Sequence, residues 1–166
     1  ARRVHGGPLL DSITLAEVNI ELFKKWFSVD FIKQLWHLNM CGNLGDPIVA
    51  KDTLEIYQYL RRNNETMGLT MHTNGSGRVA QWWRELAKIK VVAAFGIDGL
   101  EDTHSRYRVN TNWNKIIDKA KTFIEAGGEA RGSQRLRSGL LLGRASAGMV
   151  YFCRKDSMCF VLICNL

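Results

Sequence analysis

The sequence predicts an α/β fold with a parallel β-sheet, built from repeated (β/α) units. Three short, mostly apolar segments at residues 35–41, 67–72 and 91–97 have the length and composition of buried strands. Each is followed by a polar turn or loop that contains glycine, and then by a segment with helical periodicity. Strands that alternate with helices in this way indicate βαβ crossovers, and therefore a parallel sheet.

The other predicted elements follow from the same patterns. Two helices, at residues 19–27 and 31–35, precede the first strand. After it come a turn at 42–47, a helix at 51–62, a turn at 73–77, a helix at 78–89, a loop at 100–110 and a helix from 111 or 112 to 126. The pair Gly127-Gly128 ends the last helix, because glycine is the residue favoured just beyond a helix C-terminus.

After Gly128 the sequence follows neither helical nor strand periodicity, and we divide the chain into a domain at residues 1–130 and an atypical basic, cysteine-containing tail at residues 131–166. Within the tail, residues 160–164 are apolar enough to form a strand, which as an exposed edge would favour aggregation. Of the four cysteines, three lie in the tail with a spacing that fits none of the common zinc or iron–sulfur motifs. We therefore interpret the cysteines as buried or incidental thiols rather than as a ligand cluster.

The charge distribution argues against a nucleic-acid partner. The chain of 166 residues has a formal net charge of +7. Residues 131–156 hold six basic residues against one acidic residue, a balance of +5 that leaves +2 for the rest.

No segment reaches the roughly 18 consecutive apolar residues of a membrane span. The basic N-terminal residues are not followed by an apolar run, as a secretory signal would require, so we expect the protein in the cytoplasm.

The three loops that follow the strands carry the candidate functional residues, since the carboxyl ends of parallel strands share one edge of a sheet. In the first loop, Asp46 either accepts hydrogen bonds from a ligand ammonium group or serves as a turn or cap residue. In the second loop, Asn74 either binds a ligand or only holds the turn. Arg108, after the third loop, has the planar donor geometry that clamps a carboxylate.

A metal site is a weaker interpretation of the third loop. Asp98, Asp102 and His104 combine carboxylates with an imidazole, which is a workable ligand set for a metal-dependent hydrolase. The paired-histidine spacings of known hydrolases are missing, so a solvated loop with capping acids is the favoured interpretation. His37 is predicted to pack in the core, and His72 points either toward the loop face or into the barrel. The pair Trp82-Trp83 is predicted to serve packing.

In their order along the chain, the three loops resemble those of the radical S-adenosylmethionine (radical SAM) superfamily. The motifs are Gly-Asn-x-Gly-Asp-Pro at residues 42–47, Thr-Asn-Gly-Ser at residues 73–76 and Ile-Asp-Gly-Leu-Glu-Asp-Thr-His-x-x-Tyr-Arg at residues 97–108. The resemblance extends from about Ala1 to Ala130. It implies a fold made of parallel (β/α) units, as part of a TIM-like (β/α)6 barrel.

The resemblance also implies roles for seven residues as a SAM-binding set. The first loop, with Gly42, Asn43, Gly45 and Asp46, takes the place of the glycine-rich loop that binds the methionine amino group of SAM. Asn74 lies near the cofactor, Asp98 lies close to its ribose or methionine part, and Arg108 pairs with its carboxylate.

One departure from the family limits what this chain does alone. Members hold a 4Fe–4S cluster on a Cys-x3-Cys-x2-Cys motif, and this sequence contains no such motif. Residues 1–7 resemble the sequence that directly follows the last of those cysteines, so we expect a fragment that begins just after the motif. We expect neither cluster binding nor catalysis from this chain, so no catalytic or metal residue is assigned.

The parent enzyme would cleave SAM to a 5′-deoxyadenosyl radical that abstracts hydrogen, with a peptide or another protein as the candidate substrate. The alternative is a noncatalytic α/β module that binds a small ligand, or an inactive remnant.

Overall fold

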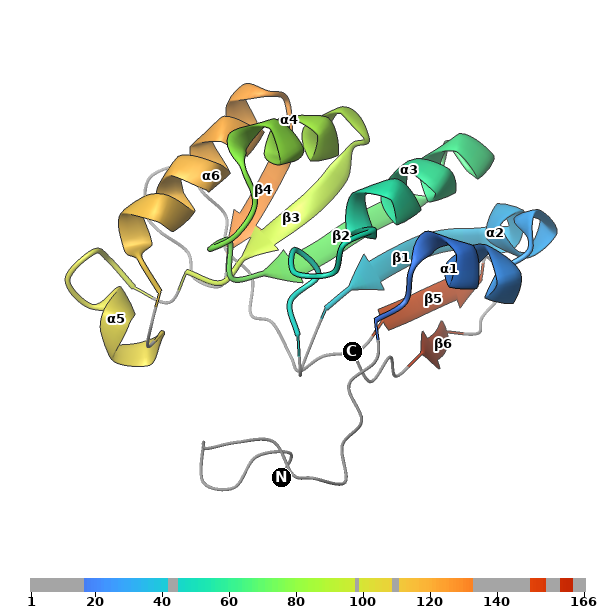
Figure 1. Ribbon diagram of the computed structural model, residues 1–166, viewed down its shortest axis with the longest axis horizontal. Helices are drawn as coiled ribbons and strands as arrows, with labels where there is room; N and C mark the ends of the chain where they lie inside the picture. Colours follow the sequence, from blue (N-terminus) through green and yellow to red (C-terminus); the bar gives the residue numbers. More distant parts are fainter. Residues whose placement is uncertain are drawn as a thin grey trace, which may run out of the picture.

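A computed structural model describes residues 17–41, 45–97, 99–108, 111–132, 150–154 and 159–162 of the chain. The elements, in chain order, are α1 (Ile20–Trp26), α2 (Val29–Gln34), β1 (Leu35–Met40), α3 (Thr53–Asn63), β2 (Gly68–Thr73), α4 (Ala80–Lys88), β3 (Val91–Phe95), α5 (His104–Tyr107), α6 (Trp113–Glu125), β4 (Glu129–Gly132), β5 (Val150–Arg154) and β6 (Cys159–Leu162). The strands form one sheet in the order β4-β3-β2-β1-β5-β6 (Figure 1).

The parallel (β/α) architecture predicted from the sequence is confirmed. Strands β1, β2, β3 and β4 are parallel neighbours, and helices α3, α4 and α6 connect them. The sequence patterns gave three of these four strands, and β4 was missed. Strand β5 pairs antiparallel with β1, and β6 pairs antiparallel with β5, so two strands of the predicted tail belong to the same sheet. The predicted strand at residues 160–164 thus corresponds to β6, at the sheet edge.

The tail boundary predicted at residue 130 falls inside β4, and the division of the chain into two parts stays a prediction. Among the described residues, no helix has both the length and the apolar character needed to cross a lipid bilayer.

Local hydrogen bonds explain where several helices begin and end. Asn19, Ser28 and Asn112 each occupy the N-cap of a helix and accept a hydrogen bond from a backbone N–H three residues ahead. Helix α6 ends at the predicted glycine pair. Gly127 has a φ of 87°, a conformation that residues with a Cβ rarely adopt, and Gly128 N–H donates to the carbonyl of Phe123 over 2.9 Å.

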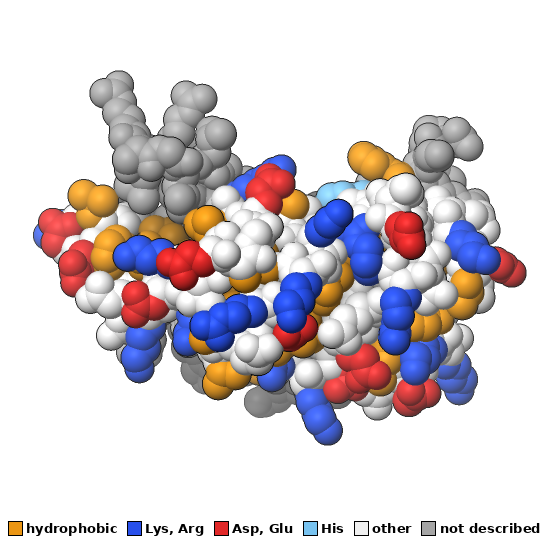
Figure 2. All heavy atoms as spheres, turned by 90° about the horizontal axis from the view of Figure 1, so that it is seen from above, with side chains coloured by type: hydrophobic (Ala, Val, Ile, Leu, Met, Phe, Trp, Pro, Cys, Tyr) orange, Lys and Arg blue, Asp and Glu red, His pale blue; other side chains and the backbone are white. Residues whose placement is uncertain are grey.

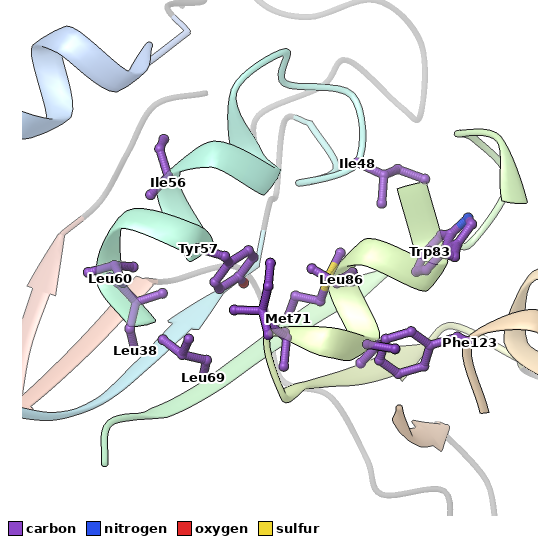
Figure 3. Close-up of a cluster of buried hydrophobic side chains, with 14 of the residues drawn as sticks. Leu38, Ile48, Ile56, Tyr57, Leu60, Leu69, Met71, Trp83, Leu86 and Phe123 are labelled. Atoms are coloured by element: carbon purple, nitrogen blue, oxygen red, sulfur yellow. The ribbon is translucent and has the colours of Figure 1, made fainter. Parts of the chain in front are cut away.

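The core lies between one face of the sheet and helices α3, α4 and α6 (Figure 1). In β2 and β3, alternate residues point into it, as Leu69, Met71 and Thr73 do in β2. Figure 3 shows the side chains of α3, α4 and α6 converging on those of the strands. The tryptophans of α4, Trp82 and Trp83, are both buried, which confirms that they serve packing. The outward face of these helices carries interspersed acidic and basic side chains (Figure 2).

On β1 and β2, the sheet face opposite the helices carries polar side chains. Thr70 Oγ1 donates to Asn39 Oδ1 over 2.8 Å and lies 3.1 Å from Nε2 of His37. His72 follows on the same face of β2, two residues after Thr70, and both are half-buried. His37, predicted to be a packed core residue, is therefore half-buried within a polar network. His72 points toward the face that would line the inside of a barrel.

These two histidines are expected to make the fold less stable in mild acid. Burial lowers the pKa of His37 and of His72, and the positive charge of Arg131 lowers that of His37 further. Because the folded state disfavours the charged imidazoles, stability is complete above the ordinary pKa of 6.5 and falls as the pH drops below it. Urea unfolding at about pH 5.5 and about pH 7.5 checks this expectation. The variant His72→Gln should show a smaller difference between the two, and an unchanged difference would contradict the assignment.

Candidate functional site

The loops after β1, β2 and β3 meet at the carboxyl edge of the sheet, as the sequence predicted. Of the predicted SAM-binding residues, Gly45, Asp46, Asn74 and Arg108 are described. The other three, Gly42, Asn43 and Asp98, lie outside the described residues, so their roles remain predictions. Gly45 is exposed and directly precedes Asp46.

Asp46 ties the first loop to the second. Its Oδ1 accepts a hydrogen bond from the N–H of Ile48 over 3.1 Å, and its Oδ2 accepts one from the N–H of Asn74 over 2.6 Å. The carboxylate therefore acts as a turn residue. Thr73 also bonds to Asp46, and since a carboxylate offers about four lone-pair positions, these three bonds leave one position for a ligand donor.

The electrostatic setting of Asp46 is mixed. The pKa of its carboxyl group is raised, because burial outweighs the hydrogen bonds from Asn74, Ile48 and Thr73 and the positive charge of Arg108, which lower it. A carboxylate that is partly withdrawn from water interacts more strongly with a ligand cation than an exposed one does. Asp46 therefore suits recognition of an ammonium group.

Asn74 holds the second loop in a tight turn. Its side-chain Oδ1 accepts hydrogen bonds from the N–H of Ser76 over 2.8 Å and from Ser76 Oγ over 2.5 Å. Gly75 follows with a φ of 68°, and a Cβ there would lie 2.7 Å from the ring of Phe95. The structure thus shows Asn74 in its turn-holding role, and contact with a ligand stays a prediction.

Arg108 reaches back from the third loop onto the end of β3. A Cβ on Gly96 would lie 3.0 Å from Nη2 of Arg108 and 3.2 Å from its Cζ, so the guanidinium lies directly against this glycine. The backbone of Gly96 is held in turn by a 2.7 Å hydrogen bond from its N–H to the carbonyl of Thr73. The guanidinium is therefore fixed at the same edge of the sheet as the carboxylate of Asp46, close enough to perturb it.

His104 supports Arg108 within the described structure. Its imidazole is buried, and Nε2 lies 3.0 Å from Oγ1 of Thr111. The hydroxyl of Thr111 donates to the carbonyl of Arg108 over 2.6 Å, and the N–H of Arg108 donates to the carbonyl of His104 over 2.9 Å. Asp102, by contrast, is exposed. No group of three or more His, Cys, Asp and Glu side chains in the described part of the chain is placed to hold a metal ion.

Two residues that sequence reasoning overlooked shape this edge. Thr73 uses its Oγ1 to accept the N–H of Gly75 over 3.0 Å, and it also bonds to Asp46. Arg78, which the helical pattern had assigned to the start of a helix, instead precedes α4 and contacts the first loop. The Ser-Gly-Arg sequence before the helix is a weak turn signal, and nothing in it identifies the partners of the arginine.

The site holds a cation and an anion at the same edge of the sheet. Arg108 offers a guanidinium that matches a carboxylate, and Asp46 offers a carboxylate that matches an ammonium group. Together they are complementary to the two charges of an α-amino acid. The methionine part of SAM carries these two charges. For an iron–sulfur cluster, the described residues offer no group of three or more His, Cys, Asp and Glu side chains, although strand pairing places Cys153 opposite Cys159.

Comparison with known proteins shows that this chain shares its fold with part of a solved enzyme structure. No protein-family model matches the chain, and no curated protein sequence is significantly similar to it. Among solved structures, the structure of this chain is similar to part of the structure of anSMEcpe with bound AdoMet (S-adenosylmethionine). That protein is an anaerobic sulfatase-maturating enzyme of the radical SAM class. The TM-score is 0.60 at 18% identity, over 76% of this chain and 36% of that chain.

A second structure of that enzyme, with bound AdoMet and the Kp18Cys peptide, matches with a TM-score of 0.50 at 18% identity, over 63% of this chain and 33% of that chain. The chain thus spans about a third of the length of the enzyme that it matches. At this identity the comparison concerns the fold alone, and the described residues share the α/β fold of a radical SAM enzyme.

Proposed function

We propose that this chain is part of a radical SAM enzyme domain and that the carboxyl edge of β1, β2 and β3 binds SAM. The observation that carries the proposal is the placement of Arg108 against Gly96, within electrostatic reach of Asp46. It gives the site one fixed cation and one fixed anion. The shared fold and the order of the three loop motifs support the same conclusion.

Each described residue of the edge has a defined task in this proposal. Arg108 binds the SAM carboxylate through its guanidinium, and His104 and Thr111 hold its backbone in place. Asp46, with the backbone of residues 42–46, binds the ammonium group. Asn74 keeps the second loop tight, so that its backbone lies close to the cofactor.

Once bound and reduced in the complete enzyme, SAM supplies the 5′-deoxyadenosyl radical that abstracts hydrogen from the substrate. We place the cluster-binding cysteine motif outside this chain, because residues 1–7 resemble the sequence that follows it. A peptide or protein is the proposed substrate, which is supported by the peptide bound to one of the similar structures. The proposed location is the cytoplasm.

Anaerobic iron–sulfur reconstitution tests the proposal on two proteins, this chain and the chain extended upstream in its gene. Ultraviolet–visible and electron paramagnetic resonance spectra are recorded with and without SAM. We expect a 4Fe–4S signal that responds to SAM from the extended protein only. If neither protein gains such a signal, the resemblance is one of fold, and a noncatalytic small-ligand-binding module becomes the better interpretation.

A further inference from the structure

Arg78 has a backbone conformation that an arginine rarely adopts. Its φ is 64°, and among the described residues other than glycine only Lys90, with a φ of 60°, shares this left-handed region. Such conformations persist where the surrounding contacts hold them in place. The contacts of the Arg78 side chain therefore explain why its backbone keeps this conformation.

The Arg78 side chain crosses from the second loop to the first. Its Nε donates to the carbonyl of Ile48 over 2.5 Å, and its Nη2 donates to the carbonyl of Ala50 over 2.6 Å. A longer contact of 3.4 Å joins Nη2 to the carbonyl of Val49. The guanidinium also lies 5.5 Å from the ring centroid of Trp82 in α4, a cation–π distance. One side chain thus fixes three successive carbonyl groups of the turn that follows Asp46.

The first loop contacts the second in return through Asp46, whose Oδ2 accepts the N–H of Asn74 over 2.6 Å. The two loops are therefore joined in both directions, by an arginine from the second and a carboxylate from the first. We call these two contacts the loop clasp. Hydrogen bonds to charged groups are stronger than neutral ones, so the clasp is a firm connection.

Apolar burial does little else to fix this part of the first loop. The side chain of Ile48 is buried, but that of Val49 is 73% exposed, and Val79, next to Arg78, is 69% exposed. Two other bonds help to hold the turn: the N–H of Val49 donates to the carbonyl of Asp46 over 2.8 Å, and the hydroxyl of Thr53 donates to the carbonyl of Pro47. Arg78 adds the polar side-chain contact that reaches the carbonyl groups of the turn from the second loop, and it thereby helps to set the orientation of Asp46.

From these contacts we infer that Arg78 is a positioning residue, which holds the turn at residues 47–50 so that the Asp46 carboxylate faces the ammonium group of SAM. The inference rests on the proposed function, since it concerns the same site. Arg78 itself does not touch the ligand. A ligand without an ammonium group would accordingly gain nothing from the clasp.

The test compares Arg78→Gly with the matched control Lys90→Gly. Glycine adopts a positive φ without strain, so both changes relieve the backbone, and only Arg78→Gly removes the arginine contact of the clasp. The affinity of each variant is measured by calorimetry for SAM and for methylthioadenosine, which lacks the amino-acid part. We expect Arg78→Gly to bind SAM about tenfold more weakly. This is the loss expected if only about a tenth of the variant molecules keep the turn in the orientation that binds SAM. Its affinity for methylthioadenosine, and both affinities of Lys90→Gly, should stay unchanged.

Equal losses for both ligands, or no loss of SAM affinity, would overturn the inference. The variant Arg78→Lys, which keeps the charge but lacks the fork of two donors, covers the case in which Arg78→Gly does not fold, and its SAM affinity should also fall selectively.

Hydrogen exchange separates a failure of this inference from a failure of the proposed function. The N–H groups of Ile48 and Asn74, which donate to Asp46, should exchange faster in Arg78→Gly whether or not the chain binds SAM. Unchanged exchange at both would reject the positioning role. Faster exchange in a chain that does not bind SAM would reject the proposed function alone.

Discussion

Replacing Arg108 with glutamine is expected to weaken SAM binding by about 100-fold, which is about 3 kcal/mol of binding free energy. The guanidinium of Arg108 lies against Gly96 at the carboxyl edge of the sheet. Its loss leaves the ligand carboxylate without a bidentate partner. The backbone bonds of residue 108 to His104 and Thr111 do not depend on the side chain, so the third loop should persist. Calorimetric titration with SAM measures the effect.

A substitution of Gly96 tests the same contact between this glycine and the guanidinium of Arg108. In Gly96→Ala, the added methyl group would lie 3.0 Å from Nη2 of Arg108, and the guanidinium has to move away. SAM affinity should fall here too, although by less than in Arg108→Gln. Arg84→Gln, on an exposed position of α4, serves as the control for the loss of one positive charge. If the control weakens binding as much as Arg108→Gln, the effect is one of general charge, and the assignment of Arg108 is wrong.

Trp83→Ala is expected to destabilise the fold by about 3–5 kcal/mol. The side chain is completely buried, and its ring centroid lies 5.2 Å from that of Phe95 and 6.1 Å from that of Phe123. It joins α4 to β3 and α6, and its Nε1–H donates to the carbonyl of Gly77 over 3.3 Å. Removing it leaves a cavity that rigid neighbouring rings cannot fill, and an acceptor without its partner.

Urea unfolding followed by circular dichroism measures this loss without relying on tryptophan fluorescence. Trp26→Ala provides a matched control, because this side chain is 51% exposed at the end of α1 and should change stability by no more than about 0.5 kcal/mol. A loss below about 1 kcal/mol for Trp83→Ala would show that α4 does not pack on the sheet as described.

Local sequence patterns predicted the parallel part of the fold well, because buried strands and amphipathic helices carry their own periodicity. The predicted strand at residues 35–41 is observed as Leu35–Met40, and the helix at 78–89 as Ala80–Lys88. Strand β4 was not predicted, because Glu129–Gly132 lacks the run of apolar residues that indicates a buried strand. The antiparallel pairing of β5 with β1 was missed because it joins segments far apart in the sequence, where no local pattern specifies a partner.

For the site, the loop motifs predicted which residues would gather at one edge, and Asp46, Asn74 and Arg108 do so. The contacts made by these residues were harder to foresee. Asp46 and Arg78 bond to backbone groups 28 to 30 residues away, and a backbone group has no signature in the sequence. The favoured prediction for the third loop was a solvated loop with capping acids, whereas His104 is buried and its Nε2 lies 3.0 Å from Oγ1 of Thr111.

The most direct test of the central claim is a titration of the ¹⁵N-labelled chain with SAM, followed by two-dimensional nuclear magnetic resonance. If this edge binds SAM, we expect saturable shifts at the backbone amides of Gly45, Asp46, Asn74 and Gly96 and at Nε of Arg108. The amides of Gly68 and Lys90, at the opposite ends of β2 and β3, should not shift. Shifts centred elsewhere, or none at a saturating SAM concentration, would contradict the claim that this edge of the sheet binds SAM.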